Sequence, residues 1–449
     1  MMDAIAPARL LWLTVLLTAY AALCLLTWRR WRRQRQGPPS ATPADWIVAY
    51  ASQTGQAEEL ARHTAASLAL AGITVRLCEL GQVTAADLAA AERMLFVVST
   101  YGEGDPPDQA AAFLAGPMAA GVPLTGLHYA VLALGDRGYA QFCGFGRALD
   151  QWLAGQGAAR LFDAIEVDRG AAAAIDRWRL GLSHLAGTSD APDWSAPPFA
   201  PWRLCERRLI NADSAGAPLY HLEFEPVQAA LPDWRAGDLA QIAAPADPDH
   251  PREYSVASIP ADGRLHLLVR LHRHADGGVG VASGWLALQA PIGAPIALRL
   301  RAHRRFRLEG NAARPLILIG NGSGMAGLRG HLRARAASGQ HGNWLLFGER
   351  QAAHDFHYRP EIEAWREAGL LTRVDVVFSR DQPARLYVQD RLAAEAEEVR
   401  RWLARGAAIY VCGSLEGMAG GVDRTLEQII GRARLDALAA QGRYRRDVY

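Results

Sequence analysis

Residues 50–61 read YASQTGQAEELA and indicate how the chain around them folds. A turn with hydroxyl groups, one glycine and no lysine lies between an apolar run and a run typical of a helix. The order strand, turn, helix predicts a phosphate-binding loop, because backbone N–H groups at a helix N-terminus point outward and carry partial positive charge. On its own the turn does not identify the phosphate, and it is equally compatible with an ordinary helix cap.

The composition argues against several classes of function. The chain has 449 residues, enough for two or three domains, and a net charge of +2. The chain contains no lysine, so all of its fixed cations are arginines. The near-neutral net charge gives no support for nucleic-acid binding. The five cysteines are scattered without a C-x-x-C pair, which argues against a disulfide framework or a zinc site and fits a reducing compartment. We predict no metal site.

An apolar segment near the N-terminus predicts a membrane anchor. Residues 10–28, LLWLTVLLTAYAALCLLTW, contain no charged residue and are about as long as a membrane-spanning helix. RRWRRQRQ follows, and arginines beside a span stay cytoplasmic. We therefore expect residues 1–9 to be non-cytoplasmic, a single span in the inner membrane, a basic and proline-rich tether over 29–45, and cytoplasmic catalytic domains. A cleaved signal peptide is the alternative, although no A-x-A site follows.

The rest of the chain divides by its apolar pattern. WIVAYAS, TVRLCEL, RMLFVVST, HYAVLAL and RLFDAIEV, separated by helical stretches, predict a doubly wound parallel sheet over residues 46–185. A linker over 186–200 precedes shorter, turn-separated runs over 201–311, which predict a β domain. The α/β rhythm returns over 312–449. The predicted fold class is α/β plus β, preceded by one transmembrane helix.

Three loops after strands of the first domain suit a ligand with a phosphate and a flat ring. They are residues 52–57, STYGEGDPPDQA from Ser99, and ALGDRGYAQFCGFG from Ala133. Ligands of such sheets bind beyond the carboxyl ends of the strands. Tyr101 and Tyr139 could clamp a ring between aromatic faces. Each loop alone is compatible with an ordinary turn, but the combination favours a binding site.

These motifs resemble the FMN domains of the diflavin reductase family. SQTGQAEELA is similar to the FMN phosphate loop, STYGEGDPPD to the second loop and LGDRGYAQFC to the third. The third loop is most similar to that of the flavoprotein subunit of NADPH-dependent sulfite reductase. The resemblance implies a flavodoxin-like fold that binds FMN through Ser52, Gln53, Thr54, Gly55, Gln56, Ala57, Thr100, Tyr101, Gly102, Gly104, Leu134, Gly135, Asp136, Tyr139, Phe142 and Cys143.

The second half resembles the FAD domain of the same family. REYSVAS, from Arg252, is similar to an Arg-x-Tyr-Ser signature in which the arginine holds the FAD pyrophosphate. GVAS, residues 280–283, is similar to the second FAD segment, where glycine permits close backbone approach. The resemblance implies that residues 201–311 form a β-barrel that binds FAD through Arg252, Glu253, Tyr254, Ser255, Val269, Gly280, Val281, Ala282, Ser283 and Tyr449.

A nicotinamide-nucleotide site is expected in residues 312–449. ILIGNGSGMAGLRG follows an apolar run and opens a helix-like run, as a dinucleotide loop does. FSRDQPARLYVQ, residues 378–389, offers arginines for a 2′-phosphate, whereas NAD would call for an acidic residue; the alternative is a solvated surface run. The resemblance implies that NADPH binds through Gly322, Ser323, Gly324, Met325, Arg350, Ser379, Arg380, Arg385, Tyr387, Gln389 and Cys412.

The end of the chain carries the residues that the family uses in hydride transfer. The resemblance implies that Cys412, Asp447 and Ser255 surround the reacting carbon of nicotinamide and that Tyr449 stacks on the flavin until nicotinamide displaces it. Their expected contribution is positioning and electrostatic support. Without the resemblance, Cys412 would be interpreted as a buried structural thiol.

The expected function is that of a membrane-anchored NADPH-dependent diflavin oxidoreductase. Electrons would pass from NADPH to FAD, to FMN, and to a one-electron acceptor protein or a ferric or haem substrate. A reductase for ferric-siderophore iron or a haem protein is one alternative, and a membrane-tethered FMN carrier without NADPH oxidation is another. The chain departs from the family in lacking a long connecting segment before REYSVAS, in Ser414 and Gly421, which replace acidic residues, and in the anchor.

Overall fold

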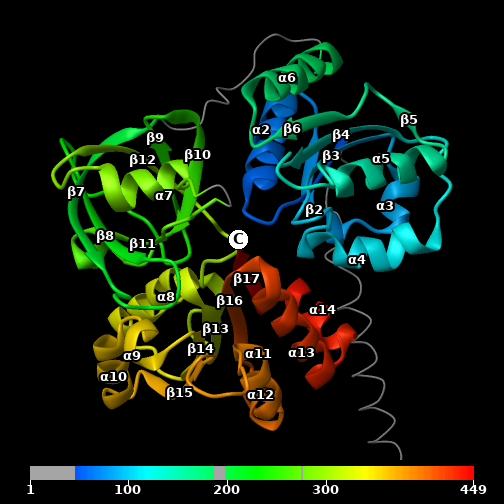
Figure 1. Ribbon diagram of the computed structural model, residues 1–449. Helices are drawn as coiled ribbons and strands as arrows, with labels where there is room; N and C mark the ends of the chain where they lie inside the picture. Colours follow the sequence, from blue (N-terminus) through cyan, green and yellow to red (C-terminus); the bar gives the residue numbers. More distant parts are fainter. Residues whose placement is uncertain (1–45, 187–197, 275–276) are drawn as a thin grey trace, which may run out of the picture. The chain divides into compact units, whose positions relative to one another are not determined.

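The computed structural model describes residues 46–186, 198–274 and 277–449, and these residues form three sheets (Figure 1). The predicted anchor at 10–28 and tether at 29–45 lie outside the described residues. Among the helices that are described, none is both long and apolar enough to cross a membrane.

The first sheet is parallel, with the strand order β2-β1-β3-β4-β5 and with β6 paired to β4. This confirms the predicted flavodoxin-like sheet. Its elements are β1 (Trp46–Ala51), α2 (Gln56–Leu70), β2 (Val75–Glu79), α3 (Ala85–Ala90), β3 (Arg93–Ser99), α4 (Ala111–Phe113), β4 (His128–Gly135), α5 (Gly144–Gly155), β5 (Ala159–Arg160), β6 (Ile165–Asp168) and α6 (Ala172–Ala186).

Helices cover both faces of the first sheet because its central strands are apolar throughout. In β1, Val48 and Tyr50 join the core under α2 and α6, whereas Ile47 and Ala49 join the core under α3, α4 and α5. Alternate residues of a strand point to opposite faces, so a strand buried on both faces is a continuous apolar run rather than an alternating one. The WIVAYA run therefore predicts a central strand.

The second sheet is antiparallel and follows the order β10-β9-β12-β7-β8-β11. Its two edge strands meet, because Val256 directly after β10 forms a bridge with Leu267 of β11. The sheet thus closes on itself as a barrel. Its elements are β7 (Ala200–Leu209), β8 (Leu219–Pro226), β9 (Leu239–Ala244), β10 (Asp247–Ser255), β11 (Leu265–Arg270), α7 (Val281–Gly284) and β12 (Pro295–Arg301).

The third sheet is parallel, with the order β15-β14-β13-β16-β17. One core packs it against α11, α12, α13 and α14, and another packs it against α8 and α10 (Figure 1). Its elements are β13 (Leu316–Asn321), α8 (Met325–Ala337), β14 (Asn343–Glu349), α9 (Ala352–Asp355), α10 (Arg359–Glu367), β15 (Leu371–Phe378), α11 (Val388–Ala394), α12 (Ala396–Ala404), β16 (Ala408–Gly413), α13 (Gly420–Ile430), α14 (Arg432–Ala440) and β17 (Tyr444–Val448).

Candidate functional site

The loop after β1 is a turn built around the hydroxyl of Ser52. Its Oγ accepts hydrogen bonds from the backbone N–H groups of Gly55 at 2.9 Å and Ala57 at 3.1 Å. Gly55 has φ 92°, in the left-handed region that favours glycine, and α2 begins at the next residue. The turn therefore presents a helix N-terminus at the carboxyl edge of the sheet, where an anion can bind.

The other two predicted loops lie at the same edge of the first sheet. β1 has β2 on one side and β3 on the other, so the loops after β1 and β3 meet where the strand order reverses. In the loop after β3, Tyr101 and Asp105 form an antiparallel bridge. In the loop after β4, Tyr139 is 40% exposed and Cys143 has φ 53° at the start of α5. The three loops thus converge on one switch point.

Unpartnered polar atoms support a polar ligand at this switch point. Gln53 Oε1, Thr100 Oγ1 and the Tyr101 hydroxyl are buried and have no hydrogen-bond partner among the described residues. Such atoms are costly unless a ligand or water satisfies them. A ligand that carries hydroxyl and phosphate groups, as FMN does, would supply partners for Gln53 and Thr100, whereas the Tyr101 ring packs against the core of the third sheet and lies 5.9 Å from the Arg446 guanidinium.

Three side chains at the end of β12 and directly after it contact the backbone of the Ser52 turn, and the sequence analysis missed them. They come from alternate residues of the run RAHRR, whose arginine density at a strand end was the available signal. Each contacts the carbonyl oxygen of a different loop residue. The contacts are Arg305 Nη1 to Ser52 O at 2.6 Å, His303 Nε2 to Gln53 O at 3.3 Å, and Arg301 Nη2 to Thr54 O at 2.7 Å.

The Arg-x-Tyr-Ser motif lies on β10 of the barrel. The Arg252 side chain is 43% exposed and lies 3.6 Å from the Asp247 carboxylate, so its guanidinium remains accessible to a pyrophosphate. Burial raises the pKa of the Tyr254 hydroxyl. At the second predicted FAD segment, Ser283 Oγ donates to Gly280 O at 3.3 Å and accepts from His272 N at 3.2 Å, which fixes the turn before α7.

Ser255, Cys412 and Asp447 meet although they are far apart in the sequence. Cys412 on β16 and Asp447 on β17 are register partners. Ser255 Oγ donates to Asp447 Oδ2 at 2.7 Å, and Cys412 Sγ lies 3.8 Å from the same oxygen. Burial raises the pKa of Asp447 to about 6, and burial together with this carboxylate raises the pKa of the Cys412 thiol. The thiol therefore stays protonated and acts as a polar neighbour rather than a nucleophile.

The first turn of α8 packs against this cluster of Ser255, Cys412 and Asp447. A Cβ on Gly324 would lie 2.0 Å from Cys412 O, so only glycine allows the loop before α8 to approach β16 this closely. A Cβ on Gly327 would lie 3.1 Å from Cys412 Sγ and 3.7 Å from Ser255 Cβ. The glycines of the dinucleotide loop therefore bring the helix N-terminus against the predicted hydride-transfer residues.

Tyr449, the last residue, lies over the dinucleotide loop. Its hydroxyl is 3.1 Å from Ser323 Oγ, its backbone N–H donates to Gly413 O at 3.1 Å, and 53% of the residue is exposed. Next to the Asp447 carboxylate, His303 Nδ1 lies 3.8 Å from Oδ1, and burial lowers the pKa of His303 to about 3. The imidazole is therefore neutral.

The predicted 2′-phosphate residues follow β14 and β15. The backbone N–H of Arg380 donates to the backbone carbonyl of Arg350 at 2.8 Å, so the two arginines are neighbours in space. Arg385 and Tyr387 are exposed on the loop before α11. A Cβ on Gly421 would lie 3.0 Å from the Gln389 side chain, so the glycine makes room for it. The structure shows no direct contact of Arg385 with the other two arginines in the part of the chain that it describes.

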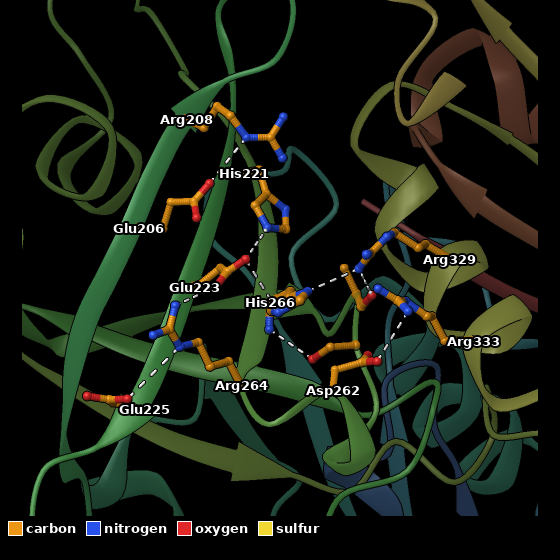
Figure 2. Close-up of polar contacts among 12 residues, drawn as sticks. Glu206, Arg208, His221, Glu223, Glu225, Asp262, Arg264, His266, Arg329 and Arg333 are labelled. Atoms are coloured by element: carbon orange, nitrogen blue, oxygen red, sulfur yellow. Dashed lines mark hydrogen bonds and ion pairs between the residues drawn. The ribbon is translucent and has the colours of Figure 1, made fainter. Parts of the chain in front are cut away.

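A charged network joins the barrel to α8, and the sequence analysis did not predict it (Figure 2). Glu223 Oε1 lies 3.2 Å from His221 Nε2 and 3.7 Å from His266 Nε2, and Arg264 donates to Glu223 Oε2 at 2.9 Å. Arg329 Nη1 is 3.1 Å from His266 Nδ1. With a cation at Nδ1, the proton of neutral His266 sits on Nε2 and points toward Glu223. The network is therefore held by hydrogen bonds and ion pairs among its own members.

Comparisons with known proteins identify two of the domains. The flavodoxin family model matches residues 48–178, and the oxidoreductase NAD-binding domain model matches residues 318–424. Relatives named sulfite reductase (NADPH) flavoprotein alpha-component match across nearly the whole chain. The protein of Neisseria meningitidis serogroup A is 30% identical over 92% of this chain and 90% of its own length, and that of Klebsiella pneumoniae is 28% identical over 92% and 91%.

The relatives contain segments that this chain lacks. The alignment with the Neisseria protein extends over 548 positions, more than the 449 residues of this chain. In the structure, β9 ends at Ala244 and β10 begins at Asp247, so a two-residue turn joins them. This is the place where the sequence analysis noted the missing connecting segment.

The predicted localisation is wrong. The relatives that match 92% of the chain are named as flavoprotein components of sulfite reductase. A spanning helix needs about 20 residues, and the longest described helices, α2 and α6, have 15 each. The segment 10–28 lies outside the described residues, and the single-pass inner-membrane assignment is not retained.

Proposed function

This chain belongs to the family of the sulfite reductase (NADPH) flavoprotein alpha-components, and from that premise we propose how its residues carry out the reaction and where the electrons go. It is an NADPH-dependent flavoprotein reductase, and its cofactors are FMN, FAD and NADPH. When bound, these cofactors supply hydride transfer from NADPH to FAD and single-electron transfer through FMN to an acceptor. The FMN carrier without NADPH oxidation is therefore set aside.

We assign FMN to residues 46–185, FAD to 201–311 and NADP(H) to 312–449. The Ser52 turn would hold the FMN phosphate, and Tyr101 and Tyr139 would hold its ring. Support comes from the convergence of the three loops at the switch point and from the unpartnered atoms of Gln53 and Thr100.

Ser255, Cys412 and Asp447 would position nicotinamide for hydride transfer. The observation that carries this proposal is their convergence from β10, β16 and β17, with Asp447 Oδ2 at 2.7 Å from Ser255 Oγ. A carboxylate next to the ring would stabilise the positive charge that nicotinamide develops as hydride leaves. Tyr449 would cover the flavin and move aside when nicotinamide binds.

The acceptor is proposed to be a one-electron acceptor carried by a separate protein. The printed name alpha-component denotes one component of a reductase, and this supports a partner for the present chain. A ferric or haem substrate belongs to the same class of one-electron acceptors.

The proposed reaction is tested by mixing the FMN- and FAD-loaded chain with NADPH without oxygen and recording the flavin absorbance. We expect bleaching with NADPH and much slower bleaching with NADH. Ser255→Ala should slow the bleaching when the rate is expressed per bound FAD. An unreactive flavin in the loaded wild-type chain would contradict the proposal.

A further inference from the structure

The barrel holds the Ser52 turn, residues 52–57, by its carbonyl groups. Three consecutive carbonyl oxygens of the turn accept hydrogen bonds from side chains at the end of β12 and directly after it. The pairs are Ser52 O with Arg305, Gln53 O with His303 and Thr54 O with Arg301. A Cβ on Gly55 would lie 3.6 Å from Arg301 Nη2, so the turn lies directly against this guanidinium. The first domain therefore does not hold this turn alone.

The N–H groups of the same peptides face the inner side of the turn. A trans peptide directs its N–H away from its C=O, so the held carbonyls fix the N–H directions of Gln53, Thr54 and Gly55. Gln53 N donates to Ser99 Oγ at 3.2 Å, and Gly55 N donates to Ser52 Oγ at 2.9 Å. Gln53 is 7% exposed and its Oε1 has no partner among the described residues, which independently points to a ligand here.

The two arginines supply positive charge that the turn lacks. Residues 52–57 contain no arginine or lysine. A guanidinium that donates to a carbonyl polarises the peptide, so the N–H on the other side becomes a stronger donor. The Arg301 side chain is 10% exposed, and Glu253 Oε1 accepts from its Nη1, so the guanidinium is fixed in place. Donors that are ordered before an anion binds lose less entropy on binding, and this raises the affinity.

His303 contributes the third contact, between the two arginines in sequence. It is fully buried, and its Nε2 must carry the proton because the Gln53 carbonyl oxygen can only accept. The imidazole is neutral, so it adds a directed donor without adding a buried charge. All three groups therefore orient the backbone of one turn from the barrel.

We propose that Arg301, His303 and Arg305 are positioning residues for the FMN phosphate, so that the FAD-binding barrel completes the FMN site. They act through the carbonyl groups of the Ser52 turn and not by contact with FMN. The proposal rests on the proposed function, since it presupposes that this turn holds the FMN phosphate. It goes further in making the affinity for FMN depend on contacts from another domain.

The test is equilibrium binding of FMN and of riboflavin to the FAD-loaded full chain from which FMN has been removed. The two probes share the same ring, but riboflavin lacks the phosphate. Arg305→Gln should raise the Kd for FMN by about tenfold, the loss expected for one charge-assisted hydrogen bond. It should leave the Kd for riboflavin unchanged within about twofold, the usual range for a substitution without a specific contact. Arg301→Gln should show the same split.

Arg304→Gln is the matched control. Arg304 is the neighbour of Arg305, and its side chain is exposed, so this variant removes the same charge from the same segment. We expect no change in either Kd. Arg305→Lys keeps a charged donor and should recover most of the affinity for FMN. Ser52→Ala removes the hydroxyl at the centre of the turn and should weaken FMN but not riboflavin.

The outcomes separate this inference from the proposed function. If Arg305→Gln binds FMN as the wild type does while Ser52→Ala weakens it, the turn holds the phosphate without the barrel and the inference is wrong. The inference is also wrong if Arg305→Gln weakens FMN and riboflavin equally, or if Arg304→Gln weakens FMN as much. If the wild-type chain binds FMN no more tightly than riboflavin, the turn is not a phosphate site and the proposed FMN assignment itself fails.

Discussion

Ser255 on β10 of the barrel donates a hydrogen bond to Asp447 on the last strand, over 2.7 Å and 192 residues of sequence. The bond links strand β10 of the barrel to strand β17 of the third sheet at the predicted hydride-transfer centre. Because Asp447 is also the register partner of Cys412, one carboxylate organises both neighbours.

Replacing Ser255 with alanine should lower the rate of flavin reduction by NADPH by about tenfold or more, since a misplaced nicotinamide loses the aligned geometry. The rate is expressed per bound FAD, and the Kd for 2′-AMP should stay as in the wild type. Ser338→Ala, at the exposed end of α8, is the control. An unchanged reduction rate in Ser255→Ala would show that the hydroxyl does not position the reacting groups.

Asp447 should make the protein less stable as pH rises. Burial raises its pKa from 3.8 to about 6, so the folded state keeps its proton where the unfolded state has lost it. The free energy of unfolding therefore falls between about pH 4 and pH 6, by about 3 kcal/mol for this shift, and then levels off. Asp447→Asn should raise the melting temperature at pH 8 relative to the wild type, with little difference at pH 4.

The control for this pH effect is Asp176→Asn on α6, where the carboxylate is 65% exposed. It should leave the melting temperature nearly unchanged at both pH values. A gain from Asp447→Asn that is equal at pH 4 and pH 8 would mean that ionisation of this carboxyl is not the cause. The same variant should oxidise NADPH more slowly, because the charge opposite nicotinamide is lost.

Arg380→Ala should raise the KM for NADPH by about tenfold or more and change the KM for NADH little, because the lost hydrogen bonds involve only the 2′-phosphate. Steady-state reduction of ferricyanide with each nucleotide measures both constants. Arg366→Ala, in the last turn of α10, is a control for the loss of an arginine. Equal weakening of NADH and NADPH would show that the cluster is not a phosphate site.

Deletion of Tyr449 should improve the use of NADH. The Tyr449 hydroxyl contacts Ser323 in the loop before α8, and under the proposed function nicotinamide would displace this side chain. Removing the terminal residue lowers the cost of that displacement, which matters most for the nucleotide that lacks the 2′-phosphate contacts. The measurement is kcat/KM for NADH in the deleted and full-length chains. No gain with NADH would indicate that Tyr449 does not cover the flavin.

The apolar pattern predicted most of the fold. The run WIVAYA is buried on both faces and forms a central parallel strand, and the turn-separated runs over 201–311 form antiparallel strands such as the pair β7 and β8. The contacts of Arg270 with Glu349, and of Arg305 with Ser52, could not be predicted in this way. They join residues 79 and 253 positions apart, and such pairs depend on how the sheets pack rather than on any local period.

The resemblance contributed what local patterns could not. Cys412 alone has the features of a buried structural thiol, and only its register with Asp447 distinguishes it. The membrane assignment was wrong because it rested on a local pattern. It used the composition of residues 10–28 and the arginines that follow them, all of which lie outside the described residues, and the relatives did not support it.

The central claim, that electrons pass from NADPH through FAD to FMN and then to the acceptor, is tested most directly by the double variant Tyr101→Ala and Tyr139→Ala. These side chains belong to the loops at the switch point of the first sheet, so the variant should lose FMN and keep FAD. NADPH-driven reduction of ferricyanide, which can accept electrons from FAD, should survive, while reduction of cytochrome c should fall by about tenfold or more. Equal loss of both activities, or full cytochrome c reduction without FMN, would contradict the account.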